Sequence, residues 1–208
     1  MSMHTVSKLI LVAVLWGTAI AHAAPERLKP YILGKPQVGD LNQVVSLTKA
    51  ALQANGFEVV GSYPPFPAAT VIVVTNDELK AAASKAPENG GFGVAQRVAV
   101  TNVDGNLQVS YVNPAYLGAA YGLGSLDGVS TKLRAALGNT LSFGSEEGMT
   151  AKQLAPGIYH YKMGMPYFDQ IDLVGKHEDY KTAVDTVEKN LAQGLGGTSK
   201  VYRIDLPN

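Results

Sequence analysis

The chain has 208 residues, of which 46% are hydrophobic, and it carries 17 basic and 17 acidic side chains. A net charge near zero gives no electrostatic footprint for nucleic acid or for an anionic membrane surface. The absence of cysteine excludes thiolate metal sites, iron–sulfur clusters, covalent c-type haem and cysteine nucleophiles.

The first residues have the features of a secretory signal peptide. Lys8 provides a short positive region, and an apolar run from Leu9 to Ile20 follows it. This run is shorter than the roughly 20 residues that a transmembrane helix needs. Small residues at Ala21 and Ala23 are typical of a signal peptidase site. We therefore expect cleavage after Ala23 and a periplasmic or secreted protein with no further membrane span; an uncleaved membrane anchor is the alternative.

Removal of residues 1–23 also reduces the number of side chains in the mature protein that could act in catalysis or bind a metal. The segment takes with it the only tryptophan and two of the four histidines, so that His160 and His177 remain. Without disulfides, the hydrophobic core alone must stabilise an exported domain. The remaining length falls within the range of one domain, and we predict a single domain over residues 24–208.

Capping residues and apolar periodicity predict five helices, and alternating or β-branched runs predict seven strands. Helices are expected from residue 41 to the stop at 55–56, over 77–86, from about 115, over 125–137 and over 177–192. Strands are expected over 57–63, 70–75, 93–103, 106–112, 158–163, 168–175 and 200–206. Pro64 and Pro65 are expected to end the first of these strands.

Two hairpins decide the predicted fold class. Asp104-Gly105 lies between two alternating runs, which is a strong hairpin signal, and Gly164-Met165-Pro166 predicts a second turn. Hairpins indicate an antiparallel sheet, and the amphipathic helices would cover one face of it. The sequence thus predicts an α+β two-layer sandwich, with residues 114–154 as a helical and loop elaboration. Residues 28–63 and 169–206 share a strand–helix–strand outline and suggest a pseudo-repeat.

Several segments resemble a known bacterial family. They are Gly61–Pro64, Ala69–Asp77, Gly90–Thr101, Val109–Tyr116, Tyr159–Asp169 and Ser199–Pro207. In these segments the chain resembles exported members of the bacterial domain-of-unknown-function family 302. The resemblance implies a curved antiparallel sheet backed by helices, similar to the TATA-binding-protein fold. It implies no catalytic residue.

Tyrosine and arginine provide the candidate ligand-binding residues. The chain has ten tyrosines, and tyrosine often lines ligand clefts because its ring packs while its hydroxyl hydrogen-bonds. Tyr63, Tyr111 and Tyr161 lie near the ends of predicted strands, and Arg97 is a strand residue able to anchor an anion. Ordinary sheet packing of the tyrosines and a solvent-facing Arg97 are the alternatives. A cleft between the sheet and the inserted helices is the expected place for a ligand.

A second set of residues suggests a metal. His160, Met163, Met165 and His177 combine imidazole with thioether, and exported copper proteins use both ligand types. Copper or haem iron is therefore the alternative cofactor, and packing of the methionines in a core or turn is the competing interpretation.

Acidic residues give a third hypothesis. Glu146, Glu147, Asp169 and Asp172 are candidates for acid–base hydrolysis if one carboxyl is held protonated. The sequence has no Gly-x-Ser-x-Gly elbow, no Gly-Lys-Ser/Thr phosphate loop and no His-Glu-x-x-His pair. A non-enzymatic exported domain that binds a small molecule or an extracytoplasmic protein is therefore the leading prediction, ahead of a metal- or haem-associated redox accessory and a hydrolase.

Overall fold

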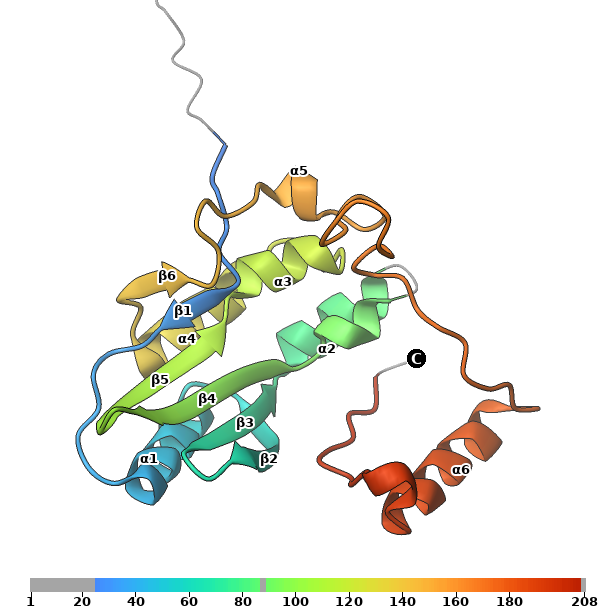
Figure 1. The fold of residues 1–208 in the computed structure, drawn as a ribbon, viewed down its shortest axis with the longest axis horizontal. Coiled ribbons are helices and arrows are strands. Elements are labelled where there is room, and N and C mark those ends of the chain that lie inside the picture. Colours follow the sequence, from blue (N-terminus) through green and yellow to red (C-terminus); the bar gives the residue numbers. More distant parts are fainter. Residues whose placement is uncertain (1–24, 87–88, 207–208) are drawn as a thin grey trace, which may run out of the picture.

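The computed structural model describes residues 25–86 and 89–206, and the predicted signal peptide lies outside the described residues. Six strands form one antiparallel sheet in the order β2-β3-β4-β5-β1-β6 (Figure 1). They are β1 (Tyr31–Leu33), β2 (Glu58–Phe66), β3 (Ala69–Thr75), β4 (Gln96–Val103), β5 (Asn106–Val112) and β6 (Leu141–Phe143). The predicted α+β class and the curved antiparallel sheet are confirmed.

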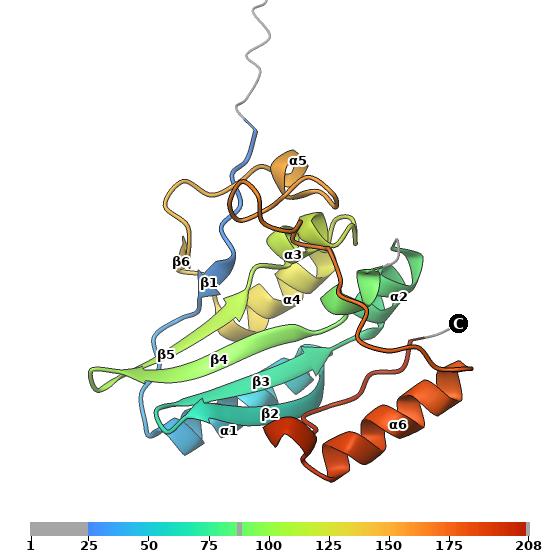
Figure 2. The ribbon, with the colours of Figure 1, turned by 45° about the vertical axis from the view of Figure 1, so that its right-hand side comes forward.

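Helices pack mainly on one face of this sheet. The helices are α1 (Leu41–Ala54), α2 (Asp77–Lys85), α3 (Pro114–Ala120), α4 (Asp127–Leu137), α5 (Ala151–Leu154) and α6 (Tyr180–Ala192), with short 3-10 segments η1 (Gly90–Gly93) and η2 (Leu195–Gly197). Helices α1 and α4 lie side by side behind the sheet in both views (Figures 1 and 2). They form the second layer of the sandwich.

The core lies between the sheet and these two helices. Alternate residues of the central strands, such as Ile72 and Val98, are fully buried on this face, where Leu52 of α1 and Leu133 of α4 cover them. Since side chains alternate along a strand, the intervening residues of β4, such as Arg97, face the other side of the sheet. Burial of so many aliphatic side chains is the main source of stability in a chain without disulfides.

Local signals place the first elements where they were predicted. The Asp40 carboxylate accepts a hydrogen bond from the Gln43 amide at 2.9 Å and begins α1. Asp104 and Gly105 both adopt positive φ, at 50° and 83°, which a two-residue hairpin turn requires. That turn pairs Val103 with Asn106 and fixes the register of β4 against β5.

The strands predicted after residue 157 are wrong. The expected hairpin over 158–163 and 168–175 is reduced to a single bridge between His160 and Tyr167. Its apolar side chains have no second layer to cover them: Tyr161 is 83% and Val174 is 98% exposed. An isolated two-stranded hairpin has little stability in water, so alternation alone forms no sheet here.

The C-terminal segment differs from its prediction in a second way. Residues 200–206 are not a strand, although Val201, Tyr202, Ile204 and Leu206 pack against the core cluster. Gly61 of β2 lets the Val201 carbonyl come close, because a Cβ at Gly61 would lie 2.6 Å from that oxygen. The predicted pseudo-repeat of residues 169–206 therefore lacks both of its strands.

Two smaller predictions also need correction. Strand β2 continues through Pro64 and Pro65 to Phe66, which an edge strand tolerates because its outer amides need no partner. Register irregularities between Tyr63 and Phe66 accompany the prolines. The predicted helical and loop elaboration over residues 114–154 also contains a strand, β6, at the other edge of the sheet.

Helix α6 lies apart from the two-helix layer, on the side of β2 (Figure 2). Its expected apolar face lines a groove of about 430 Å³, together with the C-terminal segment; these helix residues are Tyr180, Ala183, Val184, Val187 and Leu191. None of the helix residues is fully buried. Within residues 25–86 and 89–206, no helix combines the length and apolar character needed to cross a bilayer.

Candidate functional site

A cleft walled by aromatic rings opens on the face of the sheet opposite α1 and α4. Its volume is about 390 Å³. We call it the aromatic cleft; it is lined by Pro30, Tyr31, Phe92, Ala95, Arg97, Val112, Tyr116, Leu117, Ala120, Tyr121, Gly144, Tyr159 and Phe168. Arg97 is the only charged residue among these, and its side chain is accompanied by six aromatic rings.

The sheet register places the floor of the cleft. Arg97 pairs with Val73 of β3, and the next strands contribute Val112 and Tyr31, which pair with each other. Tyr31 is in turn paired with Phe143 of β6, and the two rings contact each other with centroids 5.6 Å apart. Neighbouring strands therefore place Arg97, Val112, Tyr31 and Phe143 in one row across the outer face of the sheet.

Three non-strand segments bring the remaining rings to the cleft. Phe92 from η1 stacks on Tyr121 with centroids 5.9 Å apart, and Tyr121 at the end of α3 contacts Phe168 at 5.3 Å. Phe168 also contacts Tyr159 at 5.7 Å. These contacts form a continuous chain of rings from η1 to the loop that follows α5.

Backbone hydrogen bonds hold this loop in place. The Phe168 amide donates to the Tyr159 carbonyl at 2.7 Å, which brings the two rings to the same side. The Asn89 side-chain amide donates to the Asp169 carbonyl at 2.6 Å and ties the loop to the start of η1. Helix α3 is fixed by Asn113, whose side chain accepts from the Ala115 amide at 3.1 Å and donates to the Lys29 carbonyl at 2.9 Å.

Burial in the cleft raises the pKa of two of its tyrosines, Tyr116 and Tyr121. Burial raises the pKa of Tyr116 to about 12, and the neighbouring Tyr159, which shares a hydrogen bond with it, adds to the rise. Burial also raises the pKa of Tyr121, while the Arg97 guanidinium acts in the opposite direction and the Asp169 carboxylate raises it further. At neutral pH these phenols are therefore hydrogen-bond donors beside a permanent positive charge.

Arg97 has no carboxylate partner. Among the described residues it forms no ion pair or hydrogen bond within the protein. Its side chain is exposed to the cleft, whereas its neighbours Gln96 and Val98 are fully buried and fix the strand beneath it. The sheet thus fixes the backbone at Arg97, while the donors of its guanidinium stay available.

The four residues predicted to bind a ligand do not lie at one site. Arg97 lines the aromatic cleft, but Tyr63, Tyr111 and Tyr161 do not. Tyr111 lies in the core on the opposite face of the sheet, where its hydroxyl donates to the Gly138 carbonyl at 2.9 Å. Tyr63 is on edge strand β2, and Tyr161 extends into solvent from the loop after α5.

The Asp104-Gly105 turn in the sequence is enough to predict that Arg97 and Tyr111 face opposite sides of the sheet. A two-residue turn at this dipeptide pairs Val98 with Tyr111, so Tyr111 shares the buried face of Val98 and not the face of Arg97. Phe92 and Tyr31 were not among the residues that the sequence suggested for a ligand site. Phe92 follows Asn89-Gly90-Gly91, and this glycine-rich turn gives no reason to expect an aromatic ring facing a cleft.

The predicted metal ligands are not gathered at one place. His160 stacks on Tyr167 with centroids 5.4 Å apart, while Met163 is 91% exposed. His160 lies in the loop that follows α5, whereas His177 lies shortly before α6, and α5 and α6 are well separated in both views (Figures 1 and 2). In the described part of the chain, no three His, Asp or Glu side chains come together to hold a metal ion.

The four acidic residues of the hydrolase hypothesis are also apart. Glu147 forms an exposed ion pair with Arg27 at 3.9 Å, and Glu146 and Asp172 face solvent. Both Asp169 carboxylate oxygens accept from the Gly157 amide, at 3.0 and 3.1 Å. None of the four lines the aromatic cleft.

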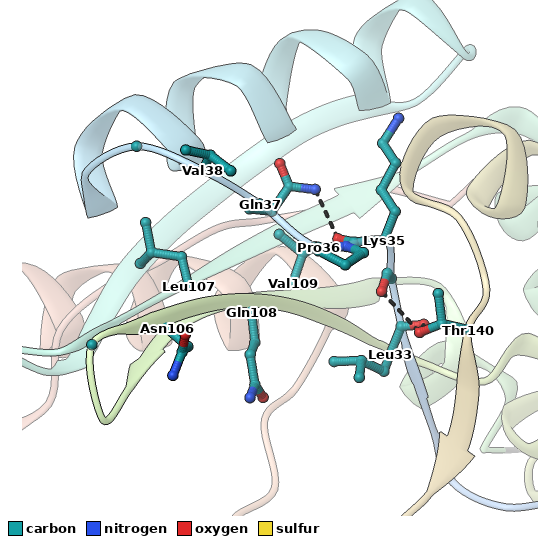
Figure 3. Close-up of a pocket in the computed structure, with 13 residues that line it drawn as sticks. Leu33, Lys35, Pro36, Gln37, Val38, Asn106, Leu107, Gln108, Val109 and Thr140 are labelled. Atoms are coloured by element: carbon teal, nitrogen blue, oxygen red, sulfur yellow. Dashed lines mark hydrogen bonds between the residues drawn. The ribbon is translucent and has the colours of Figure 1, made fainter.

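A second cavity, of about 480 Å³, lies between the loop after β1 and the hairpin of β4 and β5 (Figure 3). Its walls include Val38 and Leu107, and the Thr140 hydroxyl closes one side through hydrogen bonds to the carbonyls of Leu33 and Gly34. The long polar side chains of Lys35 and Gln108 extend in opposite directions in Figure 3. Because its polar groups do not converge, this cavity is a weaker candidate for a ligand than the aromatic cleft.

No protein-family model matches the chain, and no curated protein matches it. The resemblance to family 302 therefore stays a prediction.

Proposed function

We propose that the protein is an exported, non-enzymatic binding or accessory domain that holds a small molecule with a flat apolar body in the aromatic cleft. The convergence of six rings on one cavity, around the unpaired Arg97, carries this proposal. Export follows from the predicted signal peptide, and membership of family 302 remains part of the proposal.

The dimensions and chemistry of the cleft support a small ligand. Its volume of about 390 Å³ is within the range of roughly 300–1,000 Å³ that is usual for small-molecule sites. Aromatic walls favour a flat partner, because rings gain from offset stacking or edge contacts in addition to burial. The hydroxyls of Tyr116 and Tyr121 would orient the polar end of such a molecule.

The side chains of the cleft support binding rather than turnover. Among the residues that the structure describes, no histidine, aspartate, glutamate, serine or lysine lines the cleft, and these are the usual nucleophiles and acid–base groups. Burial raises the pKa of Tyr116 and of Tyr121 further from neutral pH, so these two phenols are poor proton carriers under ordinary conditions. A domain that recognises a ligand without converting it fits these residues best.

The test uses the mature chain, residues 24–208, and a set of uncharged and charged probes: benzamide, benzoate and benzylamine. Aromatic ring signals followed by NMR should show shifts at Phe92, Tyr121 and Phe168 with at least benzamide. For probes this small, dissociation constants on the order of millimolar are expected. Tyr121→Ala should weaken binding, and Tyr161→Ala, which removes an exposed ring outside the cleft, should not.

Two results would overturn the proposal. One is the absence of any ring shift with all three probes at concentrations well above millimolar. The other is turnover of a substrate by the purified protein that a single substitution abolishes without unfolding the chain, which would make the protein an enzyme.

A further inference from the structure

We propose that the natural ligand of the aromatic cleft is a monocarboxylate with a flat apolar body, and that the Arg97 guanidinium binds its carboxylate. This inference rests on the proposed binding function and names the class of ligand. The described residues that line the cleft carry one positive charge and no negative charge.

The sheet fixes the backbone position of Arg97. Arg97 lies on β4, an inner strand between β3 and β5, and fully buried residues flank it on both sides. Its cross-strand neighbour Val73 is apolar and fully buried, so no polar group of that strand competes for the guanidinium. A planar fork of donors held in this way matches the two oxygens of a carboxylate.

Within residues 25–86 and 89–206, no acidic residue lines the cleft. The nearby Asp169, which acts on Tyr121, lies at the rim with both oxygens turned to the Gly157 amide. A ligand carboxylate would therefore supply the counter-charge to Arg97, and Tyr121 lines the same cleft.

The residues of the cleft favour a ligand with one negative charge over a ligand with two. A phosphate monoester carries nearly two charges at neutral pH and is usually met by several cations or by a helix N-terminus. Of the described residues that line the cleft, Arg97 is the single cation, and the others are mostly aromatic or aliphatic. A singly charged head on an apolar body fits this balance, and a cationic ligand would be repelled.

The test compares benzoate with benzamide, which has nearly the same shape and no charge, and with phenyl phosphate. Each is titrated into the mature protein, and binding is followed by the ring signals of Phe92 and Tyr121. Benzoate should bind about fivefold more tightly than benzamide, as a solvent-accessible ion pair typically contributes. Added salt should weaken benzoate binding and leave benzamide binding unchanged.

Variants then assign the effect to one residue. Arg97→Gln should lower the affinity for benzoate to that for benzamide, with no change for benzamide, and Arg97→Lys should retain part of the preference. Arg134→Gln is the matched control, because Arg134 is an exposed arginine on α4, in the helical layer behind the sheet. It should leave both affinities unchanged.

The outcomes separate this inference from the proposed function. Equal affinities for benzoate and benzamide, a salt-independent benzoate affinity, or a tighter complex with phenyl phosphate would overturn the monocarboxylate assignment while the binding function stands. Failure of all probes to bind would overturn both. The salt dependence of the unmodified protein keeps the test decisive even if Arg97→Gln does not fold.

Discussion

Tyr111 provides a sharp test of the two faces of the sheet, through the variant Tyr111→Phe. Its ring is 2% exposed, its hydroxyl donates to the Gly138 carbonyl at 2.9 Å, and burial raises its pKa to about 12. At pH 7 the phenol is protonated in the folded and unfolded chain, so the variant loses only the hydrogen bond. We expect the free energy of unfolding to fall by about 1 kcal/mol.

Raising the pH should reverse this deficit. Above pH 10 the unfolded chain releases the Tyr111 proton while the folded chain keeps it up to about pH 12. The stability contributed by the protonated phenol is complete below pH 10 and is lost as the pH rises towards 12. At pH 11 the loss for the unmodified protein is about 1.4 kcal/mol. The phenylalanine variant has no such proton, so at pH 11 it should be as stable as the unmodified protein or slightly more stable.

Urea denaturation followed by far-UV circular dichroism at pH 7, 9 and 11 measures this difference. The other tyrosines are common to both proteins, and their effects cancel in the comparison. Tyr161→Phe is the control, because its exposed side chain makes the change neutral at every pH. A deficit that stays constant from pH 7 to pH 11 would refute the reasoning, since the Tyr111 phenol would then titrate alike in the folded and unfolded chain.

The remaining predictions concern export, the backbone and metals. Protein recovered from the periplasm should begin at Ala24 on N-terminal sequencing; an intact Met1 would contradict cleavage. Gly34→Ala should lower the free energy of unfolding by about 1–3 kcal/mol, because a Cβ there would lie 2.7 Å from the Leu137 carbonyl oxygen, while Gly91→Ala, which meets no atom within 4 Å, should be neutral in the same urea titration. Elemental analysis and an absorption spectrum should show no stoichiometric copper or haem; bound copper that His160→Ala removes would instead favour the redox-accessory hypothesis.

Local chemistry explains which parts of the fold the sequence predicts. The cap of α1 by Asp40 and the turn at Asp104-Gly105 depend on neighbouring residues alone, and both form as expected. The segment 158–175 also alternates, but whether an alternating run becomes a strand depends on a partner and a second layer. Its exposed apolar side chains show that neither is present.

The candidate site was harder to predict because its parts come from distant segments. Arg97 was identified from its place in an apolar strand, but Phe92, Tyr121 and Phe168 meet only after η1, α3 and the loop after α5 have packed together. Tyr111 is a candidate from the sequence because it is a tyrosine near a strand end, and Arg97 because it can anchor an anion. The register of β4 against β5 shows that the two residues face opposite sides of the sheet. Residue type suggested the ligand chemistry, while the register decided which residues share the cleft.

The most direct test of the account is the location of a bound aromatic acid. Intermolecular NOEs between benzoate and the mature protein should reach the ring protons of Phe92, Tyr121 and Phe168 and should not reach Tyr111, which lies behind the sheet. NOEs to Leu107 and Val109 of the second cavity, with none to the three rings, would show that the aromatic cleft is not the binding site.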